Sequence, residues 1–424
     1  MTGLVLLLIY AALFLGSYFA VHFIRSLGGK APRPAGGKTI AFGDESAVRP
    51  DRAASVLSVL VIFLIWGAFT GSKWVPFHVP APFVGETAFS YSARDSAGRS
   101  GTARVAIRVH EVGADIDPPG VSGGGAFVQD DAAVVGAWRS VLIRVADNDP
   151  GAASPGFRIV TVDDKFIEPG ETVRVTDGRV TLTLRGSLSF APAKGLQMEP
   201  VWMPSPEAVA QRFVEIVSGG YQNATLWQHI GWSLLRVFAG FLLGSLIGIP
   251  LGYAMGLSGW VRGWFDPIVE FMRPVPPLAL IPLVIIWFGI WETGKIVLLF
   301  LAALWIMTIA ARAGVSGVNI SKVHAAYSLG ASRRQVLAHV IVPNSLPEIF
   351  TGARVAMGVC WSTVVAAELV AAQKGVGMMI IAASKFQLTD IVIMGIILIG
   401  IVGYGIDMAM RMAERLTVPW KGRA

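Results

Sequence analysis

The sequence predicts a mainly α-helical, polytopic membrane protein with about seven spans and an inserted all-β sandwich. Of its 424 residues, 54% are hydrophobic and only 15% are charged, a composition typical of membrane proteins. Apolar residues are gathered in runs near the length that crosses roughly 30 Å of hydrocarbon. After the second run comes a long polar segment in which apolar residues alternate with polar ones, the pattern of β-strands.

Seven apolar runs are the candidate spans. The first has no Lys or Arg at its start and no small-residue cleavage site after it, so we expect a retained span and not a signal peptide. Prolines and charges interrupt residues 266–291, so the short fourth run is not expected to belong to one continuous helix. The seven runs are 4–24, 53–70, 229–257, 278–290, 295–311, 352–372 and 391–410.

Basic residues predict the orientation of the spans. The connection between the first two runs is rich in them, so it is expected in the cytoplasm. The N-terminus and the chain after residue 70 then lie outside, and counting onward places 322–334 and the tail 411–423 inside. Basic cytoplasmic loops also explain the net charge of +7; the sequence has no compact basic domain with interleaved aromatic residues, which argues against nucleic acid. The basic residues of the first connection are Arg25, Lys30, Arg33, Lys38, Arg49 and Arg52.

The polar segment 74–200 consists of short alternating stretches divided by Gly, Pro and Asp. This spacing predicts an antiparallel sandwich of immunoglobulin-like type, which the topology places outside the cytoplasmic membrane. Residues 89–109, 141–149 and 188–192 resemble strands of bacterial cadherin-like or immunoglobulin-like repeats in a rotated order, with the last hairpin first. A rotated domain that enters near 83 and leaves near 196 has its ends close together, as insertion into a loop requires.

Four aspartates and the single cysteine could have chemical roles, but structural roles are expected for both. Asp147, Asp149, Asp163 and Asp164 resemble the calcium ligands of some such repeats, but acids at these places more often form turns, and we expect no metal site. Cys360 is the single cysteine, so no disulfide can form within the chain. It lies in an apolar run and is expected to be a small buried hydrophobe.

Residues 316–347, between two apolar runs, predict a docking loop. Ala325, Ala326 and Gly330 form a small-residue face at helical spacing, which lets another backbone approach closely. We expect two short helices joined at Gly330, the second ended by Pro343 and Pro347.

The whole pattern of this loop resembles the coupling loop of ABC-importer permeases. Two positions depart from the family: His324 stands where Glu or Asp is usual, and Val342 stands where Leu is usual. The first departure puts an acidic contact to the ATPase in doubt at that position. The resemblance assigns to ATPase coupling His324, Ala325, Ala326, Gly330, Ala331, Ser332, Arg333, Ile341, Pro343 and Pro347.

Further motifs extend the resemblance over about 53–70 and 202–423, where it is closest to the taurine, alkanesulfonate and nitrate permeases. The stretch 229–252 carries a histidine, an arginine and glycines in the family spacing, and 266–289 and 366–377 carry its Pro-rich and Ala-Ala-Glu patterns. The resemblance implies a type I ABC importer permease core. It divides the chain into an extra span with a basic linker (1–52), a first core span (53–73), the β insert (74–200) and the permease core (201–424).

Charges near membrane depth usually line an interior. Glu270, Arg273 and Glu368 are such charges, and a Glu–Arg structural pair is favoured over direct contact with substrate. Prolines after Arg273 prevent a continuous helix and leave backbone N–H and C=O groups without helical partners. These groups must form hydrogen bonds with other parts of the protein or with water in a cavity. These prolines are Pro274, Pro276 and Pro277. Glycines at four-residue spacing from Gly240 predict close helix packing, either within the chain or in a dimer.

The resemblance implies a transmembrane subunit of an importer for a small organic anion, with taurine or another sulfonate first. Nitrate, bicarbonate and pyrimidine precursors are alternatives, because similar permeases carry them. The implied partners are an ATPase subunit holding ATP and Mg²⁺, an extracytoplasmic substrate-binding protein, membrane lipid and a second copy of the chain. The sequence has no phosphate-binding loop of the Walker A type, so ATP would be hydrolysed by the partner. We expect no cofactor in this chain, which would reside in a bacterial inner membrane.

Three rival classes fit the sequence less well. A secondary transporter would need coupling acids but no ATPase loop. A membrane-anchored adhesion protein would not need further spans after its sandwich. An enzyme has least support, because the six histidines are scattered and no nucleophile–base spacing is visible.

Overall fold

The computed structural model describes residues 3–27, 52–111, 114, 116–121 and 123–420. Most of the basic connection predicted to be cytoplasmic, with Lys30, Arg33, Lys38 and Arg49, lies outside these residues, as does the end of the tail with Arg423. The chain forms two compact units, Met1–Glu207 and Ala208–Ala424, and each is described by itself.

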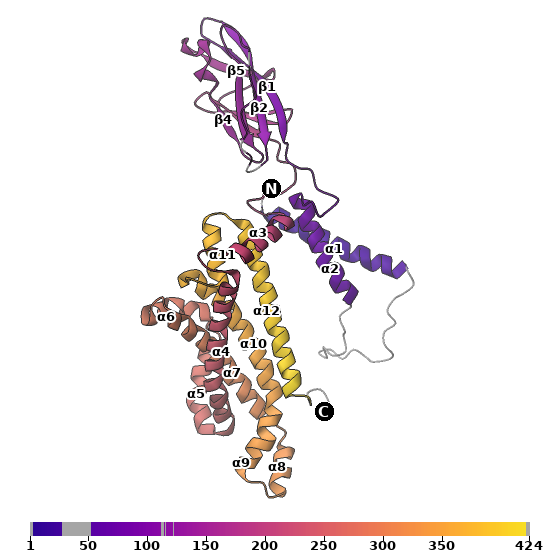
Figure 1. Cartoon of the computed structure of the whole chain (residues 1–424), viewed down its shortest axis with the longest axis vertical. Helices are drawn as coiled ribbons and strands as arrows, with labels where there is room; N and C mark the ends of the chain where they lie inside the picture. Colours follow the sequence, from indigo (N-terminus) through magenta and orange to yellow (C-terminus); the bar gives the residue numbers. More distant parts are fainter. Residues whose placement is uncertain (1–2, 28–51, 112–113, 115, 122, 421–424) are drawn as a thin grey trace. The chain divides into compact units, whose positions relative to one another are not determined.

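The first unit begins with two apolar helices and continues into a β domain (Figure 1). The helices are α1 (Gly3–Leu27) and α2 (Arg52–Thr70), which contain the first two predicted spans. The strands are β1 (Gly85–Arg94), β2 (Ser100–His110), β3 (Asp131–Gly136), β4 (Val141–Ile143), β5 (Arg158–Val162), β6 (Lys165–Phe166), β7 (Thr172–Val175), β8 (Gly178–Leu182) and β9 (Leu188–Pro192). Short 3-10 helices η2 (Val145–Asp147) and η3 (Pro150–Ala153) lie between β4 and β5.

The strands form two sheets, ordered β3-β2-β1-β5-β6 and β4-β9-β8-β7. The predicted hairpin 89–109 is confirmed: β1 and β2 pair antiparallel, with Phe89 opposite Val105. The β2–β3 pair is parallel. Phe89 of the first sheet stacks on Phe190 of the second, with ring centroids 6.1 Å apart. Apolar residues of both sheets share one core, because the period-two alternation turns each strand's apolar side inward.

The two ends of the β domain lie side by side, as the rotated strand order predicts. The amide of Phe83 donates to the carbonyl of Ala193 at 2.9 Å, and the amide of Leu196 donates to the carbonyl of Pro80 at 2.8 Å. The outgoing and returning segments are therefore hydrogen-bonded to each other. Such a domain can be inserted without separating the elements on either side of it.

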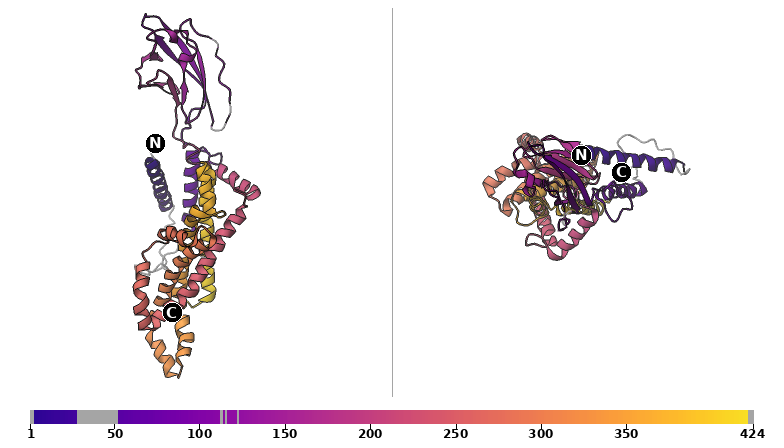
Figure 2. Two further views of the ribbon diagram at one scale, coloured as in Figure 1. Left: turned by 90° about the vertical axis from the view of Figure 1, so that its left-hand side faces the viewer. Right: turned by 90° about the horizontal axis from the view of Figure 1, so that it is seen from above.

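Helices make up the second unit, in which α4, α7 and α10 run side by side (Figures 1 and 2). Helix α3 (Pro206–Gly219) begins with the last two residues of the first unit and otherwise belongs to the second. The others are α4 (Leu226–Leu257), α5 (Gly259–Met272), η4 (Pro277–Leu280), α6 (Ile281–Phe288), α7 (Glu292–Ser316), α8 (Ile320–Ser328), α9 (Arg333–Val336), a π-helical turn η5 (Leu337–Ile341), α10 (Val342–Ala371), α11 (Val376–Lys385) and α12 (Thr389–Thr417).

Five helices among the described residues are long and apolar enough to cross a membrane. A sixth span is possible if α5 and the η4–α6 segment count as one, and these are bent by 91° at the proline-rich break. The prediction that prolines interrupt this region is confirmed. Helix α1 adds a shorter apolar stretch, Leu8–Ile24.

The glycine stripe of α4 packs against α7 within the same chain. A Cβ at Gly244 would lie 2.6 Å from Cβ of Ala303, and one at Gly248 would lie 2.7 Å from the carbonyl oxygen of Leu304. Only glycine permits this approach. Of the two interpretations left open by the sequence, packing within the chain is the one observed. Cys360 lies fully buried in the same helix cluster.

One expectation is wrong: Pro343 and Pro347 do not end a helix. Both lie within α10, and an apolar helical stretch continues from Arg333 to Leu369. The π-helical turn Leu337–Ile341 changes the hydrogen-bond register just before Pro343, so this proline falls in the first turn of α10, where its missing N–H costs little.

Candidate functional site

The predicted docking loop is a helix–turn–helix whose turn is built by Gly330. The amide of Gly330 donates to the carbonyl of Tyr327 at 2.9 Å, and the amide of Ala331 donates to the carbonyl of Ala326 at 3.1 Å. Gly330 has φ of +83°, the left-handed conformation. These two bonds and this φ define a Schellman ending for α8, which explains why glycine stands at this place.

The second arm of the loop begins with a capping box. The side chain of Ser332 accepts from the amide of Gln335, and the Gln335 side chain accepts from the amide of Ser332. The π-helical turn follows and leads into α10, and Lys322 of α8 donates to the side chain of Asn344 at 2.8 Å. The two arms are thus held in a defined geometry before any partner binds.

Helix α8 is largely exposed, with only Val323 and Ala326 partly covered. None of its residues is buried, and Leu329 at its end is 88% exposed, with Tyr327 also exposed. The ten residues that the sequence assigns to ATPase coupling run from α8 through the π-helical turn into the start of α10.

A second site is a buried ion-pair network around Glu368. Both Glu368 and Arg236 of α4 are only 1% exposed. Nη1 of Arg236 lies 2.6 Å from Oε1 of Glu368, and its Nε and Nη2 lie 2.5 and 2.8 Å from the carboxylate of Glu292 on α7. Lys295 adds a bond of 2.9 Å to Glu292. Two cations and two carboxylates therefore balance each other where α4, α7 and α10 meet.

The network also holds the connection between α10 and α11. The carboxylate of Glu368 accepts from Ser233 and from the amide of Gly377, and Arg236 donates to the carbonyl of Lys374 at 2.7 Å. Gly375 has φ of +145°, and its Cα packs so closely on Glu368 that a Cβ would overlap the carboxylate. The charges thus fix a backbone segment as well as three helices.

The sequence singled out Glu368 but did not find its partner. Arg236 was noted only as part of a family motif, although an arginine inside an apolar run is itself a strong indication of a buried pair. His229, Ser233 and Arg236 are spaced by four and three residues, so they share one face of α4. His229 bonds to the backbone of Gly375 at 3.1 Å, which brings the same connection to this face.

The other predicted core charges lie elsewhere, on α5 and beside it. Arg273 pairs with Glu270 at 3.3 Å, and both side chains are about half exposed. Nη2 of Arg312 on α7 lies 3.0 Å from Oε1 of Glu270, and Arg312 also forms an ion pair with Asp266. Pro274, Pro276 and Pro277 occupy the bent break after α5. A Glu–Arg pair therefore forms at both places, as favoured from the sequence, but Glu270 and Glu368 do not share a site.

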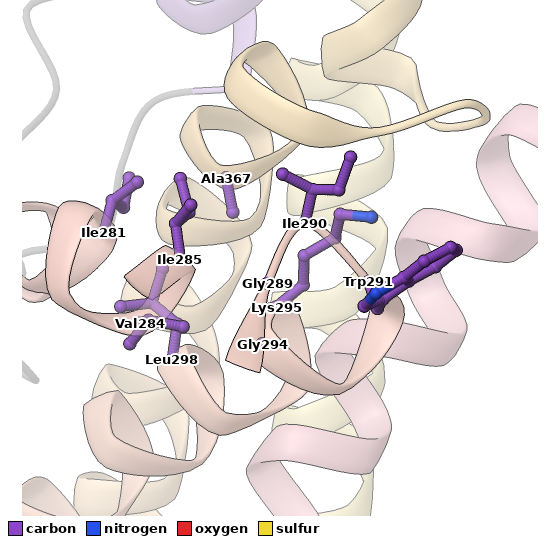
Figure 3. A pocket seen from close by; sticks show the side chains of 10 residues that line it. All are labelled: Ile281, Val284, Ile285, Gly289, Ile290, Trp291, Gly294, Lys295, Leu298 and Ala367. Atoms are coloured by element: carbon purple, nitrogen blue, oxygen red, sulfur yellow. The ribbon is translucent and has the colours of Figure 1, made fainter. Parts of the chain in front are cut away.

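A small cavity lies beside the network, between α6, α7 and α10 (Figure 3). Its lining is apolar apart from Lys295, whose side chain lies next to Ile290 and Trp291 (Figure 3). The volume of about 20 Å³ has room for about one water molecule. A cavity of this size cannot hold an organic anion, so it is not a substrate chamber in this conformation.

The candidate calcium ligands are not brought together. Asp163 accepts from the amide of Ser90, whereas Asp149 accepts from the hydroxyl of Tyr91, and neighbouring strand residues point to opposite faces. Asp147 is exposed, and Asp163 and Asp164 have positive φ, as turn residues do. Among the described residues, no three His, Cys, Asp or Glu side chains are placed to hold a metal ion.

Comparison with known proteins shows which family the chain resembles. Residues 240–418 match the family described as binding-protein-dependent transport system inner membrane component. The chain is 48% identical over 226 residues to the taurine transport system permease protein TauC of Escherichia coli (strain K12), covering 53% of this chain and 82% of the relative. It is 40% identical over 218 residues to the putative aliphatic sulfonates transport permease protein SsuC of the same strain, covering 51% and 81%. For the bicarbonate transport system permease protein CmpB of Synechococcus elongatus, identity is 33% over 198 residues, covering 46% and 71%.

A unit of several apolar helices long enough to cross a membrane, together with these permease relatives, defines a membrane transport subunit, which is not itself an enzyme. The chain belongs to the family of binding-protein-dependent transport system inner membrane components, the permeases of ABC importers.

Proposed function

We propose that this chain is the permease subunit of an ATP-driven importer for taurine or another small sulfonate. The substrate class is supported by sequence identity, which is highest to the taurine permease, lower to the sulfonate permease and lowest to the bicarbonate permease of these three relatives. Nitrate, bicarbonate and pyrimidine precursors are the alternatives within the family.

Uptake by purified components tests the substrate. The permease is reconstituted in liposomes with its ATPase and its substrate-binding protein, and ATP-dependent entry of labelled taurine is measured. We expect uptake that excess alkanesulfonate reduces and excess bicarbonate does not. Uptake of nitrate or bicarbonate without uptake of taurine would contradict the proposal.

The segment 316–347 is, in this proposal, the contact for the ATPase subunit, which holds ATP and Mg²⁺. Its support is the preformed turn at Gly330 and the exposed Leu329. Gly330→Val puts a β-branched residue at φ of +83°, so the turn should rearrange and ATPase co-purification should fall at least about tenfold.

Gly98 provides a matched control for this test. It has the same φ of +83° and equally open surroundings, but lies in the β domain. Gly98→Val should strain the backbone to the same extent and leave ATPase binding unchanged. Equal binding by the Gly330→Val protein would exclude this loop as the main contact.

A two-fold homodimer completes the proposal. Each chain offers one docking loop, whereas an importer needs two ATPase sites and a path between two halves. A two-fold symmetric dimer of this chain supplies the two docking loops and the two halves. Native mass measurement of the purified complex should give two permease copies. One copy, or a requirement for a second permease gene, would contradict the homodimer.

The β domain is proposed to lie on the extracytoplasmic side, as an accessory to transport with an immunoglobulin-like or cadherin-like origin. Its support is that its two ends are hydrogen-bonded, and that the amide of Met198 donates to the carbonyl of Phe69 at 2.9 Å. Excision of 71–197 leaves ends that are already adjacent. The shortened permease should still insert, bind the ATPase and transport; loss of its spans would contradict an accessory role.

The side of the membrane is tested by labelling. Glu171 is exposed in the β domain, and Glu171→Cys in a Cys360→Ala background offers a single thiol. A membrane-impermeant maleimide should label this thiol in spheroplasts without lysis. Labelling only after lysis would place the domain in the cytoplasm.

A further inference from the structure

Helix α1 lies outside the residues that match the permease family, as does the β domain. The two additions meet at one place. The chain leaves α2 for the β domain at Thr70 and returns near Met198, and α1 packs at this same place. We call the residues around it the root: Ile9 and Tyr10 of α1, Ala68 and Phe69 of α2, Val75 and Val79 of the outgoing segment, and Met198 of the returning one.

The root is a packed cluster and not a loose tether. Ala68, Phe69 and Val75 are buried, and Ile9, Tyr10 and Val79 pack on them. The outgoing segment folds back onto α2, since the amide of Val79 donates to the carbonyl of Ala68 at 3.2 Å. Glycine is required at Gly67, because a Cβ there would overlap the side chain of Val75.

Polar contacts hold the outgoing and returning segments at the same point. The hydroxyl of Ser72 donates to Glu207 at 2.6 Å, the amide of Lys73 donates to the same carboxylate at 2.9 Å, and Nε1 of Trp66 donates to the carbonyl of Pro204 at 3.0 Å. Segments more than 130 residues apart in the chain are therefore joined where the β domain begins and ends.

Tyr10 is the side chain through which α1 closes this cluster. Its ring meets the ring of Phe69 edge-on, with centroids 4.9 Å apart and planes at 86°. Its hydroxyl donates to the sulfur of Met198 at 2.9 Å. One side chain of α1 thus contacts both the end of α2 and the segment that returns from the β domain.

We propose that α1 is a brace for the β domain, and that Tyr10 positions the domain by locking its root. Without α1, the domain would be held to the end of α2 only by the outgoing and returning segments and their own contacts, such as those of Val79 with Ala68 and of Met198 with Phe69. With α1 in place, the β domain keeps one orientation relative to α2. It then samples a smaller volume in which it could meet a partner. The inference does not depend on which substrate is transported.

Mobility of the β domain tests the brace. Spin labels are placed at Val59→Cys on α2 and Glu171→Cys on the β domain, both exposed positions, in the Cys360→Ala full-length protein in lipid nanodiscs. The original protein should give one narrow distance distribution. Tyr10→Ala should broaden it, and Tyr10→Phe, which keeps the ring but loses the bond to Met198, should broaden it less.

Trypsin cleavage at the root gives a second measurement. Lys73 and Lys194 are exposed on the outgoing and returning segments. Loss of an aromatic pair worth about 0.5–1.5 kcal/mol should increase local opening, and with it cleavage in Tyr10→Ala, by up to about tenfold.

Tyr18→Ala is the matched control, because Tyr18 lies on the same helix, is exposed and is not part of the root. It should change neither the distance distribution nor cleavage. Deletion of residues 1–27 should reproduce the effect of Tyr10→Ala while the permease unit keeps its melting temperature. A narrow distribution and unchanged cleavage in both Tyr10→Ala and the deletion would overturn the proposal.

Discussion

Glu368 in the helical unit and Asp149 in the β domain are both buried carboxylates, but their partners differ. Glu368 is held by the guanidinium of Arg236, which a second carboxylate, Glu292, also contacts. Asp149 accepts from two neutral donors, the hydroxyl of Tyr91 at 2.8 Å and the amide of Gln129 at 2.7 Å. The comparison shows how the surroundings decide which partner a buried charge needs.

The reason is the medium around each unit. Between helices that cross a membrane, water is remote, and an isolated carboxylate would be very costly, so an opposite charge and several hydrogen bonds accompany it. Asp149 lies at the edge of the sandwich core, close to water, and there its hydrogen bonds come from neutral donors. Packing differs in the same way: α4 and α7 approach through glycines, whereas the sheets interlock through large side chains such as Phe89 and Phe190.

The largest expected effect comes from breaking the membrane pair. Arg236→Met leaves Glu368 buried without its cation, so we expect a loss of about 3–5 kcal/mol in stability. Thermal unfolding in detergent, together with ATP-dependent uptake, measures it. Arg273→Met removes an exposed arginine and should change the unfolding temperature little; equal effects of the two variants would refute the distinction between buried and exposed charges.

A smaller effect sharpens the contrast in packing. Gly244→Leu inserts a side chain where a Cβ already lies 2.8 Å from the carbonyl oxygen of Phe300, so α4 and α7 must separate. We expect destabilisation by about 1–3 kcal/mol, measured by thermal unfolding. Gly231→Leu on the same helix has no atom within 4 Å of its Cβ and should be tolerated. Equal tolerance at both positions would mean that the glycine stripe is not a packing surface.

The smallest effect concerns the carboxylates of the β domain. Burial, with the nearby charge of Asp149, raises the pKa of Asp131 to about 6. The folded domain therefore binds a proton more tightly than the unfolded chain, so its stability should rise as the pH falls from 7 through 6 towards 4, by roughly 1 kcal/mol after solvent screening.

Hydrogen exchange of β1 and β3 in the full-length protein, corrected for the intrinsic pH dependence of exchange, measures this rise. Asp131→Asn should abolish most of it. A rise that survives Asp131→Asn would assign the effect to another group.

Local sequence patterns predicted much of the observed fold. Apolar runs located the helices, the proline cluster located the 91° break after α5, and period-two alternation located the β1–β2 hairpin. The turn between the two short helices was also predicted, because it depends on a single glycine, Gly330. The wrong expectation, that Pro343 ends a helix, failed because a π-helical turn is not visible in local composition.

The sequence by itself predicted the class of the protein, most of its apolar helices, the β region and the turn at Gly330, since each depends on the periodicity or chemistry of neighbouring residues. Only the tertiary structure decided the partner of Glu368, the face on which the α4 glycines pack, and the meeting of Tyr10 with Met198. Arg236 and Glu368 are 132 residues apart, and Tyr10 and Met198 are 188 apart. Contacts over such separations arise from the packing of whole helices and sheets, which the properties of neighbouring residues do not specify.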